Sequence, residues 1–390
     1  MKKRITLWVY ALLILLLGFN VLNSPRSVKA QTKVSNVNAD QALCLPGLAE
    51  TASGDCLLAG PSRRLSELSS MGITFPENPL PLVHPPYELF KVPFSYALLD
   101  NTEVPLYATL EDAINNHPSG SFAKSKLKYI SYVKLEVTDQ GKFYQDAAGQ
   151  WMSADFVRRV AIPYYQGYLL KADLSGSFGW VLQETRSRSA PGYAAPETKH
   201  SYFRLDMVHV YDTRVVDNME WEMVGPDEWI EHRFVGKVTT NTTPPEGVTN
   251  GRWIEVNLFE QTLMVYDNQK LIFATLVATG SKPFYTRPGT FKIYKKLVND
   301  EMYGAFEADR SDYYYLEDVP YIMYYDEARA LHGAYWNTML GYPASHGCVN
   351  LSVADAHWLF DWANDGETVY IWDPSGKTPT DPAYYGPGGA

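Results

Sequence analysis

The alternation of apolar and polar residues in the last third of the chain restricts the fold most. Residues 254–258 read Ile-Glu-Val-Asn-Leu, and a period of two is typical of a β-strand with one buried face. Two further apolar runs, 262–266 and 271–278, flank the polar residues 267–270, which favour a turn. These segments therefore predict a hairpin within an antiparallel sheet.

The same region predicts one short helix. Ser352 and Asp355 have the spacing of a capping box, and the apolar residues of 353–363 fall on one helical face. Further strands are predicted at 291–294 and 368–372. Residues 374–390 are rich in Pro and Gly, so we expect a loose tail. The predicted fold class is mostly β, with a C-terminal sandwich of antiparallel strands over residues 251–373.

The start of the chain has the pattern of a secretory signal. Basic residues 2–4 precede an uncharged stretch at 5–19, and Val28 and Ala30 stand where a signal peptidase cuts. A membrane-spanning helix needs about twenty residues, and the apolar stretch is nearly that long. An uncleaved N-terminal anchor is therefore the alternative for residues 1–30. Either interpretation predicts an extracytoplasmic protein, secreted or associated with the cell wall, that touches a membrane only through this segment.

Two joints divide the rest of the chain. Residues 31–88 are expected to form a leader that ends in a proline-rich, extended linker, and residues 241–250 form a polar linker. Between these joints a pattern recurs, because Phe94-Ser-Tyr-Ala-Leu matches Phe178-Gly-Trp-Val-Leu. The recurrence predicts two related β modules, at 89–165 and 166–240.

In size and strand pattern these modules resemble the SH3-like modules of bacterial wall enzymes. Their exposed aromatic residues are candidates for contacts with wall glycan or peptide. The alternative is that most of the aromatic residues form the cores of small β units that act as spacers.

Charge and cysteine content exclude several classes of protein. The chain has 34 basic and 44 acidic residues, for a net charge of −10, and it has no basic stripe, which argues against a nucleic-acid partner. Three cysteines are too few for a disulfide-dense miniprotein or a four-cysteine zinc module. Cys44 and Cys56 are a disulfide candidate, with two free thiols as the alternative, and Cys348 is left without a partner.

Cys348 lies in the segment Ser345-His-Gly-Cys-Val-Asn350, downstream of His332-Gly333. A thiol attacks a carbonyl as the thiolate, so it needs a neighbouring base or cation. His332 is a candidate for that base because its ordinary pKa lies near neutrality. Gly347 permits a sharp turn that aims backbone N–H groups at a developing oxyanion.

A zinc site is the chemical alternative for the same residues. His332, His346 and Cys348 are possible ligands, with His357 as a fourth. Zinc hydrolases also use a carboxylate base, and none stands next to the motif in the sequence. We therefore predict no metal and no cofactor.

Residues 251–373 resemble the catalytic domain of the L,D-transpeptidases. The resemblance rests on His332-Gly333 and on the full motif at 345–350, which has the family pattern Ser/Thr-His-Gly-Cys-x-Asn/Arg. The family's turn Thr-Pro-x-Gly-x-Phe corresponds to 286–291, with its proline one place late.

The resemblance implies a role for each motif residue. Cys348 would be the nucleophile and His332 the general base, with the Gly333 carbonyl orienting the imidazole. Ser345 and His346 would shape the pocket, and the N–H groups of Gly347 and Cys348 would form the oxyanion hole. Asn350 would hold the substrate backbone, and Tyr321 would bind substrate from a lid formed by 303–336.

The implied reaction is acyl transfer between peptidoglycan stem peptides, one as donor and one as acceptor. A thioester on Cys348 would form with release of D-Ala, and an amine of a second stem would then yield a 3-3 cross-link. The alternatives are an L,D-carboxypeptidase, with water as acceptor, and an inactive wall-binding protein.

Overall fold

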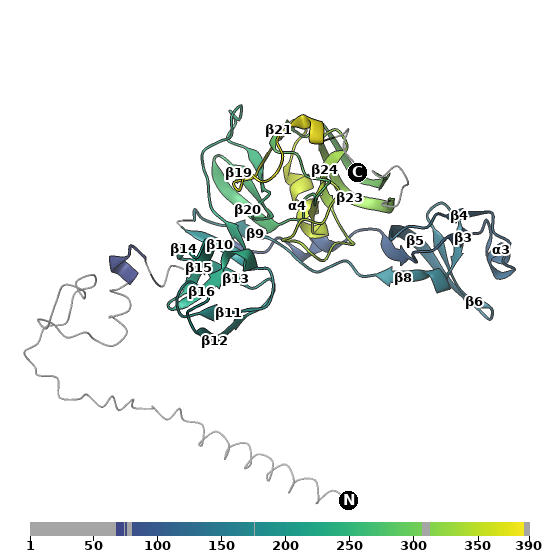
Figure 1. Ribbon diagram of the computed structural model, residues 1–390. Helices are drawn as coiled ribbons and strands as arrows, with labels where there is room; N and C mark the ends of the chain where they lie inside the picture. The colour runs from purple at the N-terminus through teal and green to yellow at the C-terminus, as the bar shows by residue number, and fades with distance from the viewer. Residues whose placement is uncertain (1–67, 74, 76–79, 175, 306–312, 386–390) are drawn as a thin grey trace, which may run out of the picture. The chain divides into compact units, whose positions relative to one another are not determined.

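The computed structural model describes residues 68–73, 75, 80–174, 176–305 and 313–385 (Figure 1). The chain divides into two compact units, 1–72 and 73–390. Of the first unit only 68–72 are described, and 68–70 are helical. The predicted signal and the pair Cys44 and Cys56 lie outside the described residues. Among the described residues no helix is both long and apolar enough to cross a bilayer.

The second unit is mostly β, which confirms the predicted fold class. The part from 251 onward contains β18 (Trp253–Asn257), β19 (Thr262–Asp267), β20 (Lys270–Leu276), β21 (Gly289–Lys292), β22 (Lys295–Gly304), β23 (Tyr314–Asp326), β24 (Arg329–Gly333), β25 (Val349–Leu351), helix α4 (Val353–Trp362) and β26 (Thr368–Trp372). The predicted hairpin is β19–β20, and the predicted last strand is β26.

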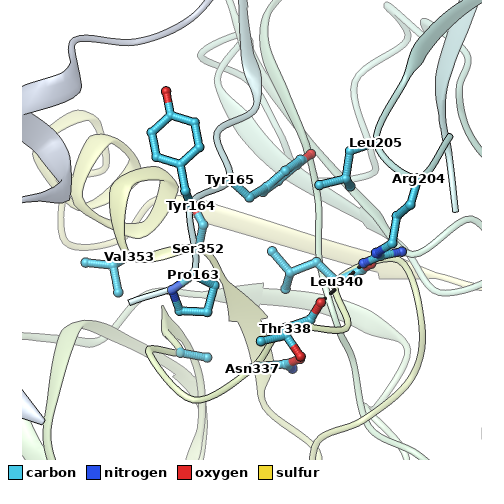
Figure 2. Close-up of a pocket in the computed structure, with 11 residues that line it drawn as sticks. Pro163, Tyr164, Tyr165, Arg204, Leu205, Asn337, Thr338, Leu340, Ser352 and Val353 are labelled. Atoms are coloured by element: carbon cyan, nitrogen blue, oxygen red, sulfur yellow. Dashed lines mark hydrogen bonds between the residues drawn. The ribbon is translucent and has the colours of Figure 1, made fainter. Parts of the chain in front are cut away.

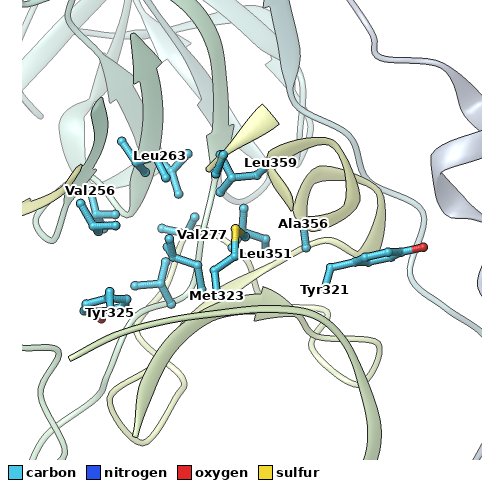
Figure 3. Close-up of a cluster of buried hydrophobic side chains, with 14 of the residues drawn as sticks. Val256, Leu263, Val277, Tyr321, Met323, Tyr325, Leu351, Ala356 and Leu359 are labelled. Carbon is cyan, nitrogen blue, oxygen red and sulfur yellow. The ribbon is translucent and has the colours of Figure 1, made fainter. Parts of the chain in front are cut away.

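Two sheets and α4 enclose the main core. One sheet has the order β1 (Leu82–Val83), β9 (Tyr168–Leu170), β20, β19, β18, β26, β21, and the other contains β25-β24-β23. Figure 1 shows α4 beside β23 and β24. In Figure 3, Val256 and Leu263 of the first sheet face Met323 and Leu351 of the second, with Leu359 of α4 closing the cluster. These side chains are fully buried.

The sheets are mostly antiparallel, as predicted, with two parallel pairs among the strands from 251 onward. β26 pairs with β18 in parallel, and β25 pairs with β24 in parallel. The connection from β25 to β26 contains α4. The short helix predicted after the motif therefore links the two sheets.

Helix α4 begins where the capping residues predicted it. Ser352 Oγ accepts from the Asp355 N–H at 3.0 Å. The Asp355 carboxylate accepts from Gly167 N at 3.0 Å and from Thr275 Oγ1 at 2.6 Å. Burial raises the pKa of Asp355 to about 6, and these donors supply the hydrogen bonds that a buried carboxyl requires.

The first module contains β2 (Ser95–Leu99), β3 (Val104–Leu106), α3 (Leu110–Ile114), β4 (Gly120–Phe122), β5 (Leu127–Thr138), β6 (Gly141–Asp146), β7 (Trp151–Ser153), the 3-10 helix η2 (Ala154–Phe156) and β8 (Val157–Val160). The second contains β10 (Ser177–Val181), β11 (Thr185–Arg188), β12 (Glu197–Tyr202), β13 (Met207–Val210), β14 (Asp212–Val216), β15 (Met219–Gly225), β16 (Glu228–Glu231), η3 (His232–Phe234) and β17 (Val235–Val238). We call these sets module 1 and module 2.

The two modules share a local arrangement. β2 lies between β5 and β8, and β10 lies between β13 and β17. Each last strand follows a 3-10 helix that ends in phenylalanine, Phe156 or Phe234. The relation of the modules to each other and to SH3-like modules stays a prediction.

Short strands from the predicted linkers join the sheet of β18–β20. β1 (Leu82–Val83) pairs with β9 (Tyr168–Leu170), and β9 pairs with β20. The expected leader and the expected start of module 2 at residue 166 thus both include a strand of this sheet. Two further 3-10 helices are η1 (Tyr87–Phe90) and η4 (Pro382–Tyr384).

The C-terminal tail is ordered as far as Tyr385, contrary to the expectation of a loose tail. Asp373 accepts from Ser375 and Thr378, and the Arg329 guanidinium lies 5.4 Å from the Tyr385 ring centroid. Cation–π contact and turn hydrogen bonds fix this segment.

Module 1 and the C-terminal region share a sheet through β5 and β23. The Glu317 carboxylate of β23 accepts from the Ser131 N–H of β5 at 2.7 Å. Burial raises the pKa of Glu317 to about 7, and the neighbouring acids Asp146 and Asp318 raise it further. A carboxyl buried at this seam is therefore half protonated near neutral pH.

Glu317 is expected to make this seam less stable as the pH rises. Its folded-state pKa exceeds the ordinary value of 4.5, so folding is favoured while the carboxyl is protonated, and that advantage is lost as the pH rises toward 7. Replacing Glu317 by Gln should reduce the fall in unfolding free energy between pH 4.5 and 8 by about 2 kcal/mol, with allowance for solvent screening. Urea unfolding of both proteins across this range measures the difference, and equal pH slopes would contradict the assignment.

Candidate active site

Pairing of β24 with β25 brings the two sequence motifs together. In this parallel pair His332 lies opposite Asn350 and Leu331 lies opposite Val349. Neighbouring strands are about 4.8 Å apart. Cys348 directly precedes β25, so its backbone enters the strand beside the one that carries His332.

His332 and Cys348 line the same small pocket. Its lining residues are Leu127, Met302, Tyr314, Leu316, His332, Trp336, Ala344, Ser345, His346, Cys348 and Asn350. The cavity has a volume of about 30 Å³, which holds a water or two and no peptide. A substrate would have to widen this space to reach the thiol.

The Cys348 thiol is buried, with 3% of the residue exposed. Sγ lies 3.9 Å from the Ala328 carbonyl oxygen, to which the S–H donates. Burial raises the pKa of Cys348 to about 11, against the smaller lowering effects of a backbone hydrogen bond from Ala330 and of the Arg329 charge. Cys348 is therefore a thiol at rest, and it would need a base to act as a nucleophile.

His332 is buried as well, and burial lowers its pKa to about 4, with a small opposing effect of Gly333. Its Nδ1 lies 3.2 Å from the Gly333 carbonyl oxygen. A carbonyl only accepts, so Nδ1 carries the proton in this hydrogen bond and Nε2 keeps its lone pair. The imidazole is neutral at pH 7 and has the tautomer that a general base needs.

The turn that contains Gly347 is held by hydroxyl groups. Ser345 Oγ donates to the Cys348 carbonyl at 2.5 Å and accepts from the Gly347 N–H at 3.1 Å. Thr286 Oγ1 donates to the Gly347 carbonyl at 2.8 Å. Gly347 has a φ of 119°, a backbone conformation that favours glycine. The Gly347 N–H predicted for the oxyanion hole is thus already bonded to Ser345.

His346 and Asn350 occupy different sides of the motif. The half-buried His346 ring stacks on Tyr314, with centroids 5.2 Å apart, and forms part of the pocket wall. The Asn350 backbone pairs with Ala278, with N–O distances of 2.9 and 3.0 Å. This pairing ties the motif to the strand region after β20, and the Asn350 residue also lines the pocket.

Tyr321 does not line this pocket, contrary to the prediction. Its ring stacks on His357 of α4 with centroids 4.1 Å apart, and it belongs to the main core. Successive side chains of a strand point to opposite faces. Tyr321 and Met323 lie on the core face of β23, whereas Tyr314 lies on the pocket face.

The aromatic wall of the pocket is formed by Tyr314 and Trp336. Both fall within the segment 303–336 predicted as a lid, of which 306–312 lie outside the described residues. Positive φ values at Asp318 and Tyr321 interrupt the strand between the pocket-facing Tyr314 and the core-facing Tyr321.

His357, the fourth possible zinc ligand, also lies outside the pocket. Its Nδ1 lies 3.2 Å from the Leu89 carbonyl oxygen. Within the described residues the one group of side chains close enough to share a metal ion is Glu220, Glu222 and His232 of module 2. Lys237 Nζ donates to Glu222 at 2.8 Å there, so a cation already occupies the cluster.

A second cavity, of about 60 Å³, lies between residues 163–165, module 2 and the loop after β24 (Figure 2). Arg204 crosses it and donates to the Leu182 carbonyl at 2.6 Å and to the Leu340 carbonyl at 2.7 Å. The described lining of the cavity includes no cysteine or histidine, and the hydroxyl of Ser352 caps α4. The Arg204 guanidinium thus connects module 2 to the loop after β24.

The arrangement defines a buried cysteine–histidine pair of the kind used for acyl transfer. The family model "YkuD: L,D-transpeptidase catalytic domain" matches residues 251–371. Residues 251–371 therefore match the L,D-transpeptidase catalytic-domain family, and the resemblance carried by the motif is confirmed.

Solved structures similar to the chain are also L,D-transpeptidases. One, from Stackebrandtia nassauensis, is 28% identical with a TM-score of 0.27, and the match covers 34% of this chain and 60% of the Stackebrandtia chain. The NMR structure of the E. faecium catalytic domain is 25% identical, with a TM-score of 0.29 and coverage of 32% and 100%. An enzyme from Mycobacterium smegmatis is 16% identical, with a TM-score of 0.30 and coverage of 55% and 93%.

The chain thus spans 60% of the length of the first of these structures. A comparison with curated proteins gives no match.

Proposed function

We propose that the protein is an exported L,D-transpeptidase that forms 3-3 cross-links between peptidoglycan stem peptides. One observation supports this most: His332 and Cys348 line one pocket, and the Gly333 carbonyl selects the tautomer of His332 that leaves Nε2 free to act as a base. The N-terminal signal pattern supports export. The family match at 251–371 supports the L,D-transpeptidase chemistry.

In the first half-reaction, His332 Nε2 takes the proton of the Cys348 thiol, and Sγ attacks the carbonyl between the diamino acid and the terminal D-Ala. The C–N bond then breaks, the D-Ala amine takes the proton from the imidazolium, and a thioester remains on Cys348. Arg329 favours the transient negative charge on sulfur, because its cation lowers the pKa of Cys348.

In the second half-reaction, the side-chain amine of another stem attacks the thioester carbonyl. His332 accepts a proton from the amine, the C–S bond breaks, and the proton returns to Sγ. The oxyanion formed in both halves needs backbone donors. Because Gly347 N–H is bonded to Ser345 Oγ at 3.1 Å, it would stabilise the oxyanion only after exchanging that hydrogen bond, whereas the Cys348 N–H is the second candidate.

Incubation of the purified protein with disaccharide tetrapeptide tests the proposal, with products identified by mass spectrometry. A cross-linked dimer that has lost one D-Ala is expected. Tripeptide alone would indicate an L,D-carboxypeptidase that uses water, and unchanged tetrapeptide would favour a wall-binding protein without activity.

A tetrapeptide with its side-chain amine acetylated is the matched control. It can donate but cannot accept, so each Cys348 should be acylated with release of one D-Ala, and no dimer should form. A dimer from the acetylated substrate would contradict attack by that amine.

A further inference from the structure

Strand β5 of module 1 forms an edge of the catalytic pocket. Residues 127–129 pair in parallel with residues 314–316 of β23, with Leu127 opposite Tyr314. Tyr314 and Leu316 line the pocket, and so does Leu127. The wall beside Cys348 is therefore built from two segments far apart in the sequence.

Leu127 reaches the nucleophile's own hydrophobic cluster. This cluster contains Cys348, Met302, Tyr314 and Leu316 as buried members, and the half-buried Leu127 packs against it. The pocket lining thus combines this apolar cluster with the polar residues His332 and Asn350. Such a surface suits an aliphatic group and disfavours a charged one.

The position of Leu127 is fixed from both directions along β5. Its N–H donates to Ser125 Oγ at 3.1 Å, and Ser125 Oγ donates to the Tyr313 carbonyl. Further along, the Ser131 N–H donates to Glu317 at 2.7 Å. These contacts attach β5 to β23 on both sides of the paired residues.

Module 1 also packs behind the strand of the catalytic histidine. The Tyr96 ring of β2 stacks on Tyr335, with centroids 3.5 Å apart, and Tyr96 OH donates to the Asp318 carbonyl at 2.8 Å. Tyr335 follows β24 by two residues and is fully buried. Contacts at both β23 and the loop after β24 hold module 1 in one position against the site.

We infer that module 1 is part of the active site, and that Leu127 is a specificity-determining residue that contacts the aliphatic part of the acyl donor. The inference rests on the proposed function. A cavity of about 30 Å³ becomes a peptide site only if its wall yields, so the size of residue 127 controls both the access to Cys348 and the fit of the donor.

Variants Leu127→Ala and Leu127→Trp of the full chain test the inference. Leu135 lies on the same strand, roughly 26 Å further along, and is 40% exposed, so Leu135→Ala and Leu135→Trp are matched controls. The first measurement is the rate at which iodoacetamide alkylates Cys348, followed by peptide mass spectrometry. The second is kcat and KM for the tetrapeptide donor.

The alkylation rate is expected to rise about tenfold in Leu127→Ala and to fall about tenfold in Leu127→Trp, by the usual effect of a change in size within an apolar pocket. KM for the donor should rise about tenfold in Leu127→Ala with kcat nearly unchanged, because an apolar contact present throughout the reaction is lost. Both Leu135 variants should match the unaltered protein.

Equal alkylation rates in the Leu127 and Leu135 variants would overturn the inference. If Leu127→Trp does not fold, the comparison of Leu127→Ala with Leu135→Ala tests the inference alone. Leu127 is half-buried at the edge of module 1, so its truncation is expected to leave the core intact. If the unaltered protein turns over no stem peptide, but Cys348 is alkylated faster in Leu127→Ala and slower in Leu127→Trp, the proposed function is rejected and the role of Leu127 in the pocket wall stands. If the protein is active but these alkylation rates do not differ, the proposed function stands and the inference about Leu127 is rejected.

Discussion

Replacing Cys348 by alanine is expected to reduce product formation from tetrapeptide about a thousandfold or more, to the background level. Every covalent step of the proposed reaction passes through this sulfur, and no other described residue of the pocket is a thiol. Liquid chromatography with mass spectrometry of both the dimer and the tripeptide measures the loss.

The structure predicts that this variant folds normally. The Cys348 side chain is small, and its hydrogen bond to the Ala328 carbonyl is long, at 3.9 Å. The thermal unfolding midpoint should therefore change by a few degrees at most, as is usual for a change of about 1 kcal/mol. Full activity in a folded Cys348→Ala variant would end the mechanism.

Alkylation of Cys348 is expected to accelerate about tenfold for each pH unit between pH 7 and 10. Burial raises the thiol pKa to about 11, so the protonated form persists through this range and the thiolate fraction grows with pH. Over three units the rate should change about a thousandfold. Stopped samples analysed by peptide mass spectrometry give the rate at Cys348 alone.

A rate independent of pH between 6 and 9 would contradict this picture, because it would require a preformed thiolate–imidazolium pair.

The rate of acyl transfer is also expected to fall at acidic pH. Since burial lowers the pKa of His332 to about 4, the base stays neutral above that pH and becomes protonated below it. Activity should therefore fall as the pH drops through 4, and a fall already near pH 6.5 would contradict the neutral, buried imidazole.

Much of the catalytic region could be predicted because its signals are local. The alternation at 254–258 is β18, the polar residues 267–270 include the turn of the β19–β20 hairpin, and Ser352 caps α4. The chemistry of Cys348 and His332 was also legible, because it depends on residue types within two short motifs.

The side of the pocket opposite these motifs could not be predicted in the same way. Asp318 and Tyr321 have φ values of 48° and 58°, which interrupt regular strand geometry in β23. The sequence does not mark such interruptions at non-glycine residues. Tyr321, predicted to bind substrate, accordingly lies in the main core, and Tyr314 lines the pocket.

Contacts between distant segments were likewise invisible. Leu127 reaches the pocket because β5 pairs with β23, and the two-residue strand β1 joins a sheet through β9. A short strand is stabilised mainly by pairing with its partner strand. The sequence of the short strand does not specify which strand it pairs with or in which register. The sequence places module 1 and the catalytic region in separate parts of the chain, whereas β5 and β23 belong to one sheet.

The most direct test of the central claim is the intact mass of the protein after brief exposure to tetrapeptide and acid quenching. We predict an added mass equal to the substrate less D-Ala, mapped by proteolysis to Cys348 and removed by hydroxylamine, as expected for a thioester. The Cys348→Ala variant should gain no mass. Product formation with no adduct at Cys348, or an adduct mapped to another residue, would contradict the account.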